Sequence, residues 1–137
     1  MREKLAIGSL FKSKKTNRCL FLIRNGKSFK GQFGLVGGKV RKNEDLLNCL
    51  AREIEEEIGF IPEIKKFVNI SEFVSEDYEF KFFSVLIVVD EEFVPVLNEE
   101  SSGYAWVDLR HLPKPMHPRL MELIKNELVL RSIEKFK

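Results

Sequence analysis

Residues 38–60, GKVRKNEDLLNCLAREIEEEIGF, are the stretch that decides the fold of this chain. Asn43 is a good N-cap residue near its start, and Gly59 is a typical helix stop near its end. Between them, apolar residues recur every four positions, which is the spacing of one helix face, at Leu46, Leu50, Ile54 and Ile58. The pattern predicts a helix over residues 44–58, with negative charge in its first turn where the helix dipole favours it.

Three glutamates of this helix predict a metal site. Glu53, Glu56 and Glu57 are separated by steps of three and four residues, so a helix places their carboxylates on one face. Carboxylates this close repel one another unless a cation offsets the repulsion. Because oxygen ligands suit a hard divalent cation, we expect Mg²⁺ here, with Mn²⁺ as a substitute. Gly37 and Gly38 precede the helix, and their backbone can approach a metal closely, so a carbonyl oxygen there is a further expected ligand.

The same stretch resembles the Nudix box, Gly-x5-Glu-x7-Arg-Glu-U-x-Glu-Glu-x-Gly-U, in which U is a bulky apolar residue. Every fixed position of the box is filled, from Gly38 to Phe60. The wider resemblance to Nudix hydrolases (MutT-like proteins) runs over about residues 5–130. It implies the Nudix fold, an α/β/α sandwich with a mixed sheet and a catalytic strand-loop-helix. It also implies Mg²⁺-dependent hydrolysis of the diphosphate bond in nucleoside diphosphate derivatives, such as ADP-ribose, dinucleoside polyphosphates or nucleoside triphosphates.

The resemblance implies a role for individual residues of the box. Arg52 matches the arginine that holds a glutamate in place, and Glu44 matches an acidic position for which we expect a structural role. Lys39 follows the two glycines, where it would contact a phosphate. The expected metal ligands are Glu53, Glu56, Glu57 and Gly38, and the expected loop around the metal and substrate is formed by Gly37, Gly38 and Lys39.

The general base is open between the helix and a later acidic loop. A carboxylate must accept a proton as metal-activated water attacks phosphorus, and Glu56 or Glu57 could do so. Related enzymes often supply this group from a loop in the position of residues 90–103. Glu100 is the first candidate there, and Glu99 is its competitor.

The rest of the chain predicts strands before and after this helix and a second helix at the end. Residues 63–74 and 78–89 read as a hairpin, and residues 90–103 as a loop with a short strand at 93–97. Pro118 suits the first position of a final helix running to about residue 136, with Leu128 on its buried stripe. Further strands are expected at residues 5–11, 19–23 and 104–109. We therefore expect an α/β fold in which helices cover a mixed sheet, in a single domain of residues 1–137.

Composition limits the classes of partner. The formal net charge of +2 gives no indication of DNA binding, and the longest apolar run is too short to span a bilayer. No signal peptide is visible, which predicts a cytoplasmic protein without a membrane partner. Cys19 and Cys49 lie in apolar stretches and are expected to be reduced core residues.

Three functions remain open from the sequence. The first is hydrolysis of a small-molecule nucleotide; the second is pyrophosphohydrolysis at an RNA 5′ end, which needs a basic surface beside the site. The third is a nucleotide sensor without activity, which the complete set of glutamates disfavours. His111 and His117 have no ligand spacing and receive no catalytic role, and His117 is expected beside a helix cap. A homodimer is a further expectation from the resemblance.

Overall fold

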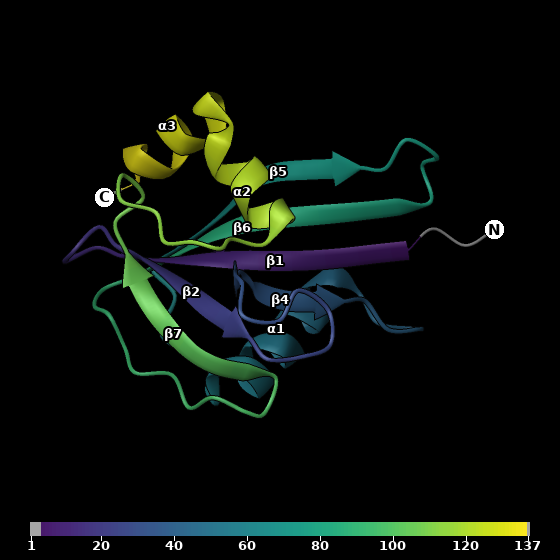
Figure 1. The fold of residues 1–137 in the computed structure, drawn as a ribbon, viewed down its shortest axis with the longest axis horizontal. Helices are drawn as coiled ribbons and strands as arrows, with labels where there is room; N and C mark the ends of the chain where they lie inside the picture. Colours follow the sequence, from purple (N-terminus) through teal and green to yellow (C-terminus); the bar gives the residue numbers. More distant parts are fainter. Residues whose placement is uncertain (1–3, 137) are drawn as a thin grey trace.

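The computed structural model describes residues 4–136, which form a mixed sheet between two helical layers (Figure 1). This confirms the α/β/α sandwich. The helices are α1 (Leu46–Ile58), α2 (Pro118–Lys125) and α3 (Glu127–Lys135). The strands are β1 (Lys4–Ser13), β2 (Cys19–Arg24), β3 (Phe33–Gly34), β4 (Val36–Lys39), β5 (Lys66–Val74), β6 (Phe80–Val89) and β7 (Ser101–Val107). None of the helices within these residues is long and apolar enough to cross a bilayer.

The central strand β1 divides the sheet. Along one edge it runs parallel to β6, and β6 continues into the predicted hairpin with β5. Its other edge is shared, because the first half of β1 pairs with β4 and its last residues pair with β2. β2 in turn pairs with β3 and β7. β4 and β2 therefore pair with β1 at different positions along its length. The chain between them, residues 25–35, contributes to the lining of the cleft described below.

The two faces of the sheet bury separate apolar clusters, since side chains alternate along a strand. In β1, Ile7 and Phe11 pack towards α1, whereas Leu10 packs towards α2 and α3. Residues 19–22 of the apolar run are buried on both faces of the sheet, whereas Ile23 is half-buried. Cys19 and Cys49 are buried, unpaired thiols in these clusters, as expected.

The start of α1 differs from the prediction. Asp45, not Asn43, is the N-cap, and its side chain accepts a hydrogen bond from the Asn48 N–H at 2.8 Å. Glu44 stays outside the helix because its carboxylate accepts from the Arg41 N–H at 3.0 Å. Asn43 and Asp45 are both favourable capping residues, so local preference alone does not decide between them.

The final helix is also interrupted. Asn126 has an extended backbone, and its side chain accepts hydrogen bonds from the N–H groups of Leu128 and Val129, so it caps a separate α3. The interruption rotates the second helix relative to the first. As a result the prediction for Leu128 is wrong: it is 78% exposed, whereas Val129 and Ile133 are buried.

The short strand predicted at residues 93–97 does not form. The Val96 N–H donates to the carbonyl of Ile58 at the end of α1, at 2.6 Å, instead of to a strand. Phe93 packs edge-on against Phe11 and Trp106. This loop is ordered by α1 and the core, which the local sequence pattern does not reveal.

Candidate active site

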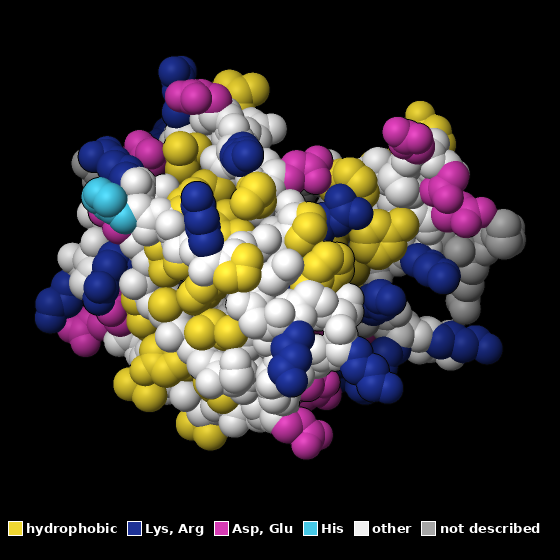
Figure 2. Space-filling model, viewed as in Figure 1, with side chains coloured by type: hydrophobic (Ala, Val, Ile, Leu, Met, Phe, Trp, Pro, Cys, Tyr) yellow, Lys and Arg dark blue, Asp and Glu magenta, His cyan; other side chains and the backbone are white. Residues whose placement is uncertain are grey.

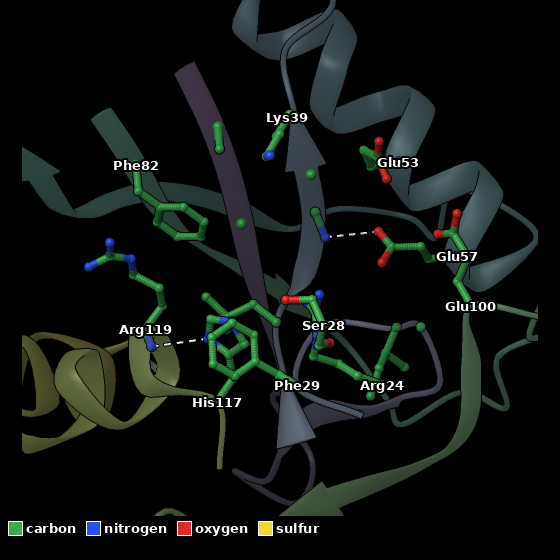
Figure 3. Close-up of a pocket in the computed structure, with 18 of the residues that line it drawn as sticks. Arg24, Ser28, Phe29, Lys39, Glu53, Glu57, Phe82, Glu100, His117 and Arg119 are labelled. Atoms are coloured by element: carbon green, nitrogen blue, oxygen red, sulfur yellow. Dashed lines mark hydrogen bonds between the residues drawn. The ribbon is translucent and has the colours of Figure 1, made fainter. Parts of the chain in front are cut away.

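A cleft of about 970 Å³ opens between α1, β4, the loop at residues 25–29 and the start of α2 (Figure 3). Glu53 and Glu57 of α1 line one side together with Glu100, which precedes β7. Phe82 and Arg119 lie across the cleft from them in the close-up. The cleft therefore has an acidic wall and a wall of aromatic and basic groups.

Glu57 is the most buried of the acidic groups, at 9% exposed. Its Oε2 accepts a hydrogen bond from the N–H of Gly37 at 2.9 Å, which ties α1 to β4. Burial, together with the negative charges of Glu53 and Glu100, raises the pKa of Glu57 to about 9. A carboxylate with so high a pKa lacks a compensating positive charge.

Arg52 connects the start of the box to its glutamates. Its guanidinium donates to both carboxylate oxygens of Glu44, at 2.8 and 3.0 Å, and to Oε1 of Glu53 at 2.5 Å. A further hydrogen bond reaches the Lys39 carbonyl at 3.2 Å. The hydrogen bond from Arg52 lowers the pKa of Glu44 to about 2, whereas burial raises the pKa of Glu53 despite the same partner. The geometry is that of an arginine orienting Glu53, with Glu44 as its anchor.

The structure brings most of the predicted residues together, but not all of them. The cleft is lined by Gly37, Gly38, Lys39, Arg52, Glu53, Glu57 and Glu100. Glu56 lies outside this lining: its side chain is 43% exposed and pairs with Arg52 at 3.4 Å and with Arg41 at 3.9 Å. Glu99 lies outside it too, and its carbonyl accepts a hydrogen bond from Asn25. The arrangement favours Glu100 over Glu99 as the outside carboxylate.

The donor set of the cleft fits a hard divalent cation. Glu53, Glu57 and Glu100 offer carboxylate oxygens, the ligand type that Mg²⁺ prefers. A Cβ at Gly38 would lie 2.6 Å from the Glu53 carboxylate, so glycine keeps this carboxylate close to the β4 backbone. Within residues 4–136, no three acidic, histidine or cysteine side chains are already gathered as metal ligands. Glu53 is hydrogen-bonded to Arg52, and Glu57 is hydrogen-bonded to the Gly37 N–H.

The opposite wall contains groups that sequence reasoning missed or left unassigned. Arg119 was not predicted; its guanidinium carbon lies 3.6 Å from the centre of the Phe73 ring. Phe29 packs edge-on against His117 at 4.4 Å between ring centres. The start of α2 brings His117 and Arg119 here, and the only signal for this in the sequence is Pro118, which marks the helix start.

His117 caps α2 and lines the cleft at the same time. Its Nδ1 accepts a hydrogen bond from the Arg119 N–H at 3.1 Å, so His117 is the N-cap itself and not only a neighbour of the cap. Burial, reinforced by the positive charges of Arg24 and Arg119, lowers the pKa of His117 to about 4. The imidazole is therefore neutral near pH 7, with Nδ1 as acceptor and Nε2 as donor.

Comparison with known proteins gives matches over nearly the whole chain. A family model described as NUDIX domain matches residues 3–126. The ADP-ribose pyrophosphatase of Methanocaldococcus jannaschii is 30% identical over 101 residues, covering 73% of this chain and 60% of that protein. The 8-oxo-dGTP diphosphatase of Buchnera aphidicola is 28% identical over 115 residues, covering 80% of this chain and 90% of that protein.

A solved structure gives the same result for the fold. The MutT protein from Methanosarcina mazei superposes with a TM-score of 0.68 at 24% identity, covering 99% of this chain and 97% of that one. The sequence resemblance drawn from residues 38–60 agrees with these matches. On the family match over residues 3–126, this chain belongs to the NUDIX domain family.

Proposed function

We propose that this protein hydrolyses the diphosphate linkage of a nucleotide derivative with Mg²⁺ bound at the acidic wall of the cleft. One observation carries the proposal: Glu53, Glu57 and Glu100 line a single cleft beside the β4 backbone, with aromatic and basic groups on the other side. A surface acidic run would instead point into solvent and would leave the pKa of Glu57 near its ordinary value.

The chain's own residues would divide the chemistry as follows. Glu53 and Glu57 would hold the cation, with Glu56 joining if its side chain turns from Arg41 into the cleft. Bound Mg²⁺ would offset the negative charge of the diphosphate and acidify a water molecule. Glu100 would accept the proton as water attacks phosphorus. Arg52 would keep Glu53 oriented through its anchor on Glu44.

The opposite wall would hold the nucleotide. Phe29 and Phe82 offer apolar faces to a base or sugar, and Arg24, Lys27 and Lys39 offer positive charge to phosphates. Arg119 is held against Phe73 and presents a guanidinium to the same space. The two relatives compared above are named for ADP-ribose and for 8-oxo-dGTP, so both compound classes are candidate substrates.

A 5′-triphosphorylated or capped RNA is the second candidate. The observation that favours it is the basic lining of the cleft, which includes Arg24, Lys27, Lys39, Arg41 and Arg119. Figure 2 shows lysine and arginine side chains scattered among apolar and acidic ones over the face of the molecule that it draws. Positive charge on this scale suits a polyanion longer than one diphosphate.

An assay panel tests the proposal and separates the candidates. It measures Mg²⁺-dependent release of mononucleotide or pyrophosphate from ADP-ribose, diadenosine polyphosphates, 8-oxo-dGTP, nucleoside triphosphates and 5′-triphosphorylated RNA. We expect turnover of at least one small nucleotide that EDTA abolishes. Turnover of RNA alone would favour the second candidate, and binding without turnover across the panel would favour a sensor.

The location and assembly of the protein are separate parts of the proposal. We infer a cytoplasmic protein from the sequence, and we expect a homodimer by resemblance. Sedimentation velocity at micromolar concentration measures the assembly directly.

A further inference from the structure

The loop that carries Glu100 also ends helix α1. A helix leaves its last four carbonyls without partners inside the helix. In α1 the Glu55 carbonyl is satisfied by the N–H of Gly59. The Glu56 carbonyl accepts from Nδ2 of Asn98 at 2.8 Å, and the Ile58 carbonyl accepts from the Val96 N–H at 2.6 Å. Two carbonyls that the helix cannot satisfy are thus bound by the loop at residues 93–100.

The same asparagine holds the backbone of Glu100. While its Nδ2 donates to α1, the Oδ1 of Asn98 accepts from the Glu100 N–H at 2.9 Å. On the far side, the Asn25 N–H donates to the Glu100 carbonyl at 2.9 Å, and its side chain donates to the Glu99 carbonyl at 3.0 Å. Both peptide groups of Glu100 are therefore fixed, one to α1 through Asn98 and one to the end of β2 through Asn25.

These backbone hydrogen bonds matter for the position of Glu100. Its carboxylate has no hydrogen bond or ion pair with the residues that the structure describes, and its side chain lies at the open edge of the cleft. Glu100 nevertheless lines the same side of the cleft as Glu53 and Glu57 (Figure 3). The distance between Glu100 and the α1 glutamates is set by the backbone, and Asn98 is the side chain that links the two.

We infer that Asn98 is a positioning residue for the proposed hydrolysis: it sets Glu100 in place against the glutamates of α1. The inference rests on the proposed function, in which Glu100 accepts a proton from water. It adds that the C-terminal end of α1 fixes the position of Glu100 through Asn98. The helix that carries the metal ligands and the loop that carries the base would therefore move as one unit.

A double-mutant cycle between Asn98 and Glu100 tests the inference. A general base contributes about 10²–10⁴-fold to rate, so we expect Glu100→Gln to lower kcat about 100-fold. Asn98→Ala is expected to lower kcat about tenfold with little change in KM, since the substrate wall is untouched. Because Asn98 acts through Glu100, the double variant should be no slower than Glu100→Gln alone. Independent effects would instead multiply to about 1000-fold.

Asn126→Ala is the matched control. Asn126 also uses its side chain to bind backbone groups at a helix end, but that end belongs to α3, away from the cleft. Its loss should lower stability without changing kcat. Asn98→Asp separates the two bonds of Asn98, because aspartate can accept from the Glu100 N–H but cannot donate to the Glu56 carbonyl. We expect it to lower kcat as Asn98→Ala does.

Amide hydrogen exchange gives a readout that does not depend on activity. In Asn98→Ala the Glu100 amide should exchange about tenfold faster, while amides in the middle of α1, such as that of Ile54, keep their protection. Uniformly faster exchange would mean general destabilisation and would overturn the inference.

The kinetic outcomes separate the inference from the proposed function. Parental kcat in Asn98→Ala or Asn98→Asp would overturn the inference but leave the function standing. Parental kcat in Glu100→Gln would remove Glu100 as the base, and the inference with it. No turnover by the parent protein would refute the function itself.

Discussion

Glu57 is 9% exposed, and its carboxylate accepts a hydrogen bond from the Gly37 N–H. Glutamine has the same shape and can still accept from that N–H, so Glu57→Gln should fold normally. Without its charge the cation is held less well, and we expect kcat to fall about 100-fold in the hydrolysis assay. Glu55→Gln, on the exposed side of α1, is the control and should keep parental activity. Near-parental turnover in Glu57→Gln would contradict the assignment.

The same residue predicts a pH dependence of stability in EDTA. Because the pKa of Glu57 is raised from its ordinary 4.5 to about 9, the folded state binds this proton more tightly than the unfolded state. The free energy of unfolding should then fall as the pH rises from about 4.5 to about 9. Glu57→Gln removes this contribution and should be more stable than the parent at pH 8 in EDTA. Urea unfolding at several pH values measures this dependence. A Glu57→Gln variant less stable than the parent at pH 8 would contradict a destabilising charge at Glu57.

Arg119 belongs to the wall that would bind substrate rather than to the acidic wall. Its stacking on Phe73 holds the guanidinium at the cleft. Glutamine cannot reach as far and carries no charge, so Arg119→Gln should raise KM about tenfold, equivalent to about 1.4 kcal/mol, with kcat within about twofold. Arg131→Gln on α3 is the control, since the Arg131 side chain is 75% exposed and pairs with Glu127 outside the cleft. A fall in kcat at constant KM would place Arg119 in the chemistry instead.

At the scale of elements, the N-terminus of α2 depends on a neutral histidine. The Nδ1 of His117 accepts from the Arg119 N–H, and protonation would remove this acceptor. Its pKa is lowered from 6.5 to about 4, so the folded state binds the proton less tightly and stability should fall as the pH drops from about 6.5 to about 4. Asparagine also caps helices well, so His117→Asn should reduce this loss.

Urea unfolding between pH 4 and 7 checks the prediction for α2. His111→Asn is the control because His111 is 84% exposed near Asp108 and caps no helix. If the free energy of unfolding falls equally at acid pH in the parent and in His117→Asn, His117 is not the source of that fall.

The end of α1 depends on Gly59. This residue has a left-handed φ of 93°, and a Cβ on it would lie 2.7 Å from Cβ of Val96. Gly59→Ala combines the cost of that backbone conformation with displacement of the loop, and should destabilise the protein by about 1–2 kcal/mol or more. Gly26→Ala, where a Cβ meets no atom within 4 Å, is the control for stability. Equal free energies of unfolding for the two variants would show that the loop at Val96 shifts without a loss of stability.

At the scale of the whole molecule, β1 contributes side chains to both apolar clusters, so the two helical layers pack on a shared strand. We propose that residues 1–137 form a single domain that unfolds in one transition. Mg²⁺ that binds only the folded state should raise the free energy of unfolding by about 2.7 kcal/mol at a concentration 100 times its Kd. The Tm of the transition should rise accordingly. Calorimetry with Mg²⁺ and then EDTA measures the shift, which Glu57→Gln should largely lose. Two separate transitions would contradict the single domain.

Much of the fold was predictable because its signals are local. The four-residue apolar spacing and Gly59 mark α1, the β-branched runs mark the hairpin, and Pro118 marks the start of α2. The box likewise brings Arg52, Glu53 and Glu57 into one cleft, because a single helix and the adjoining strand carry them. Spacing along one helix is a geometric fact that needs no knowledge of the rest of the chain.

Other features depend on contacts between distant segments, and only the tertiary structure decided them. Glu56 and Glu57 are adjacent, yet Glu57 is buried against β4 while Glu56 is half exposed beside Arg41. Glu100 rather than Glu99 lines the cleft, in a loop that Asn98 and Asn25 hold from both sides. The sequence by itself determined which acids lie on one helix face. Packing between segments dozens of residues apart decided which of these acids enters the cleft and which groups face them. In that packing, burial and the need to satisfy backbone hydrogen bonds outweigh local preference.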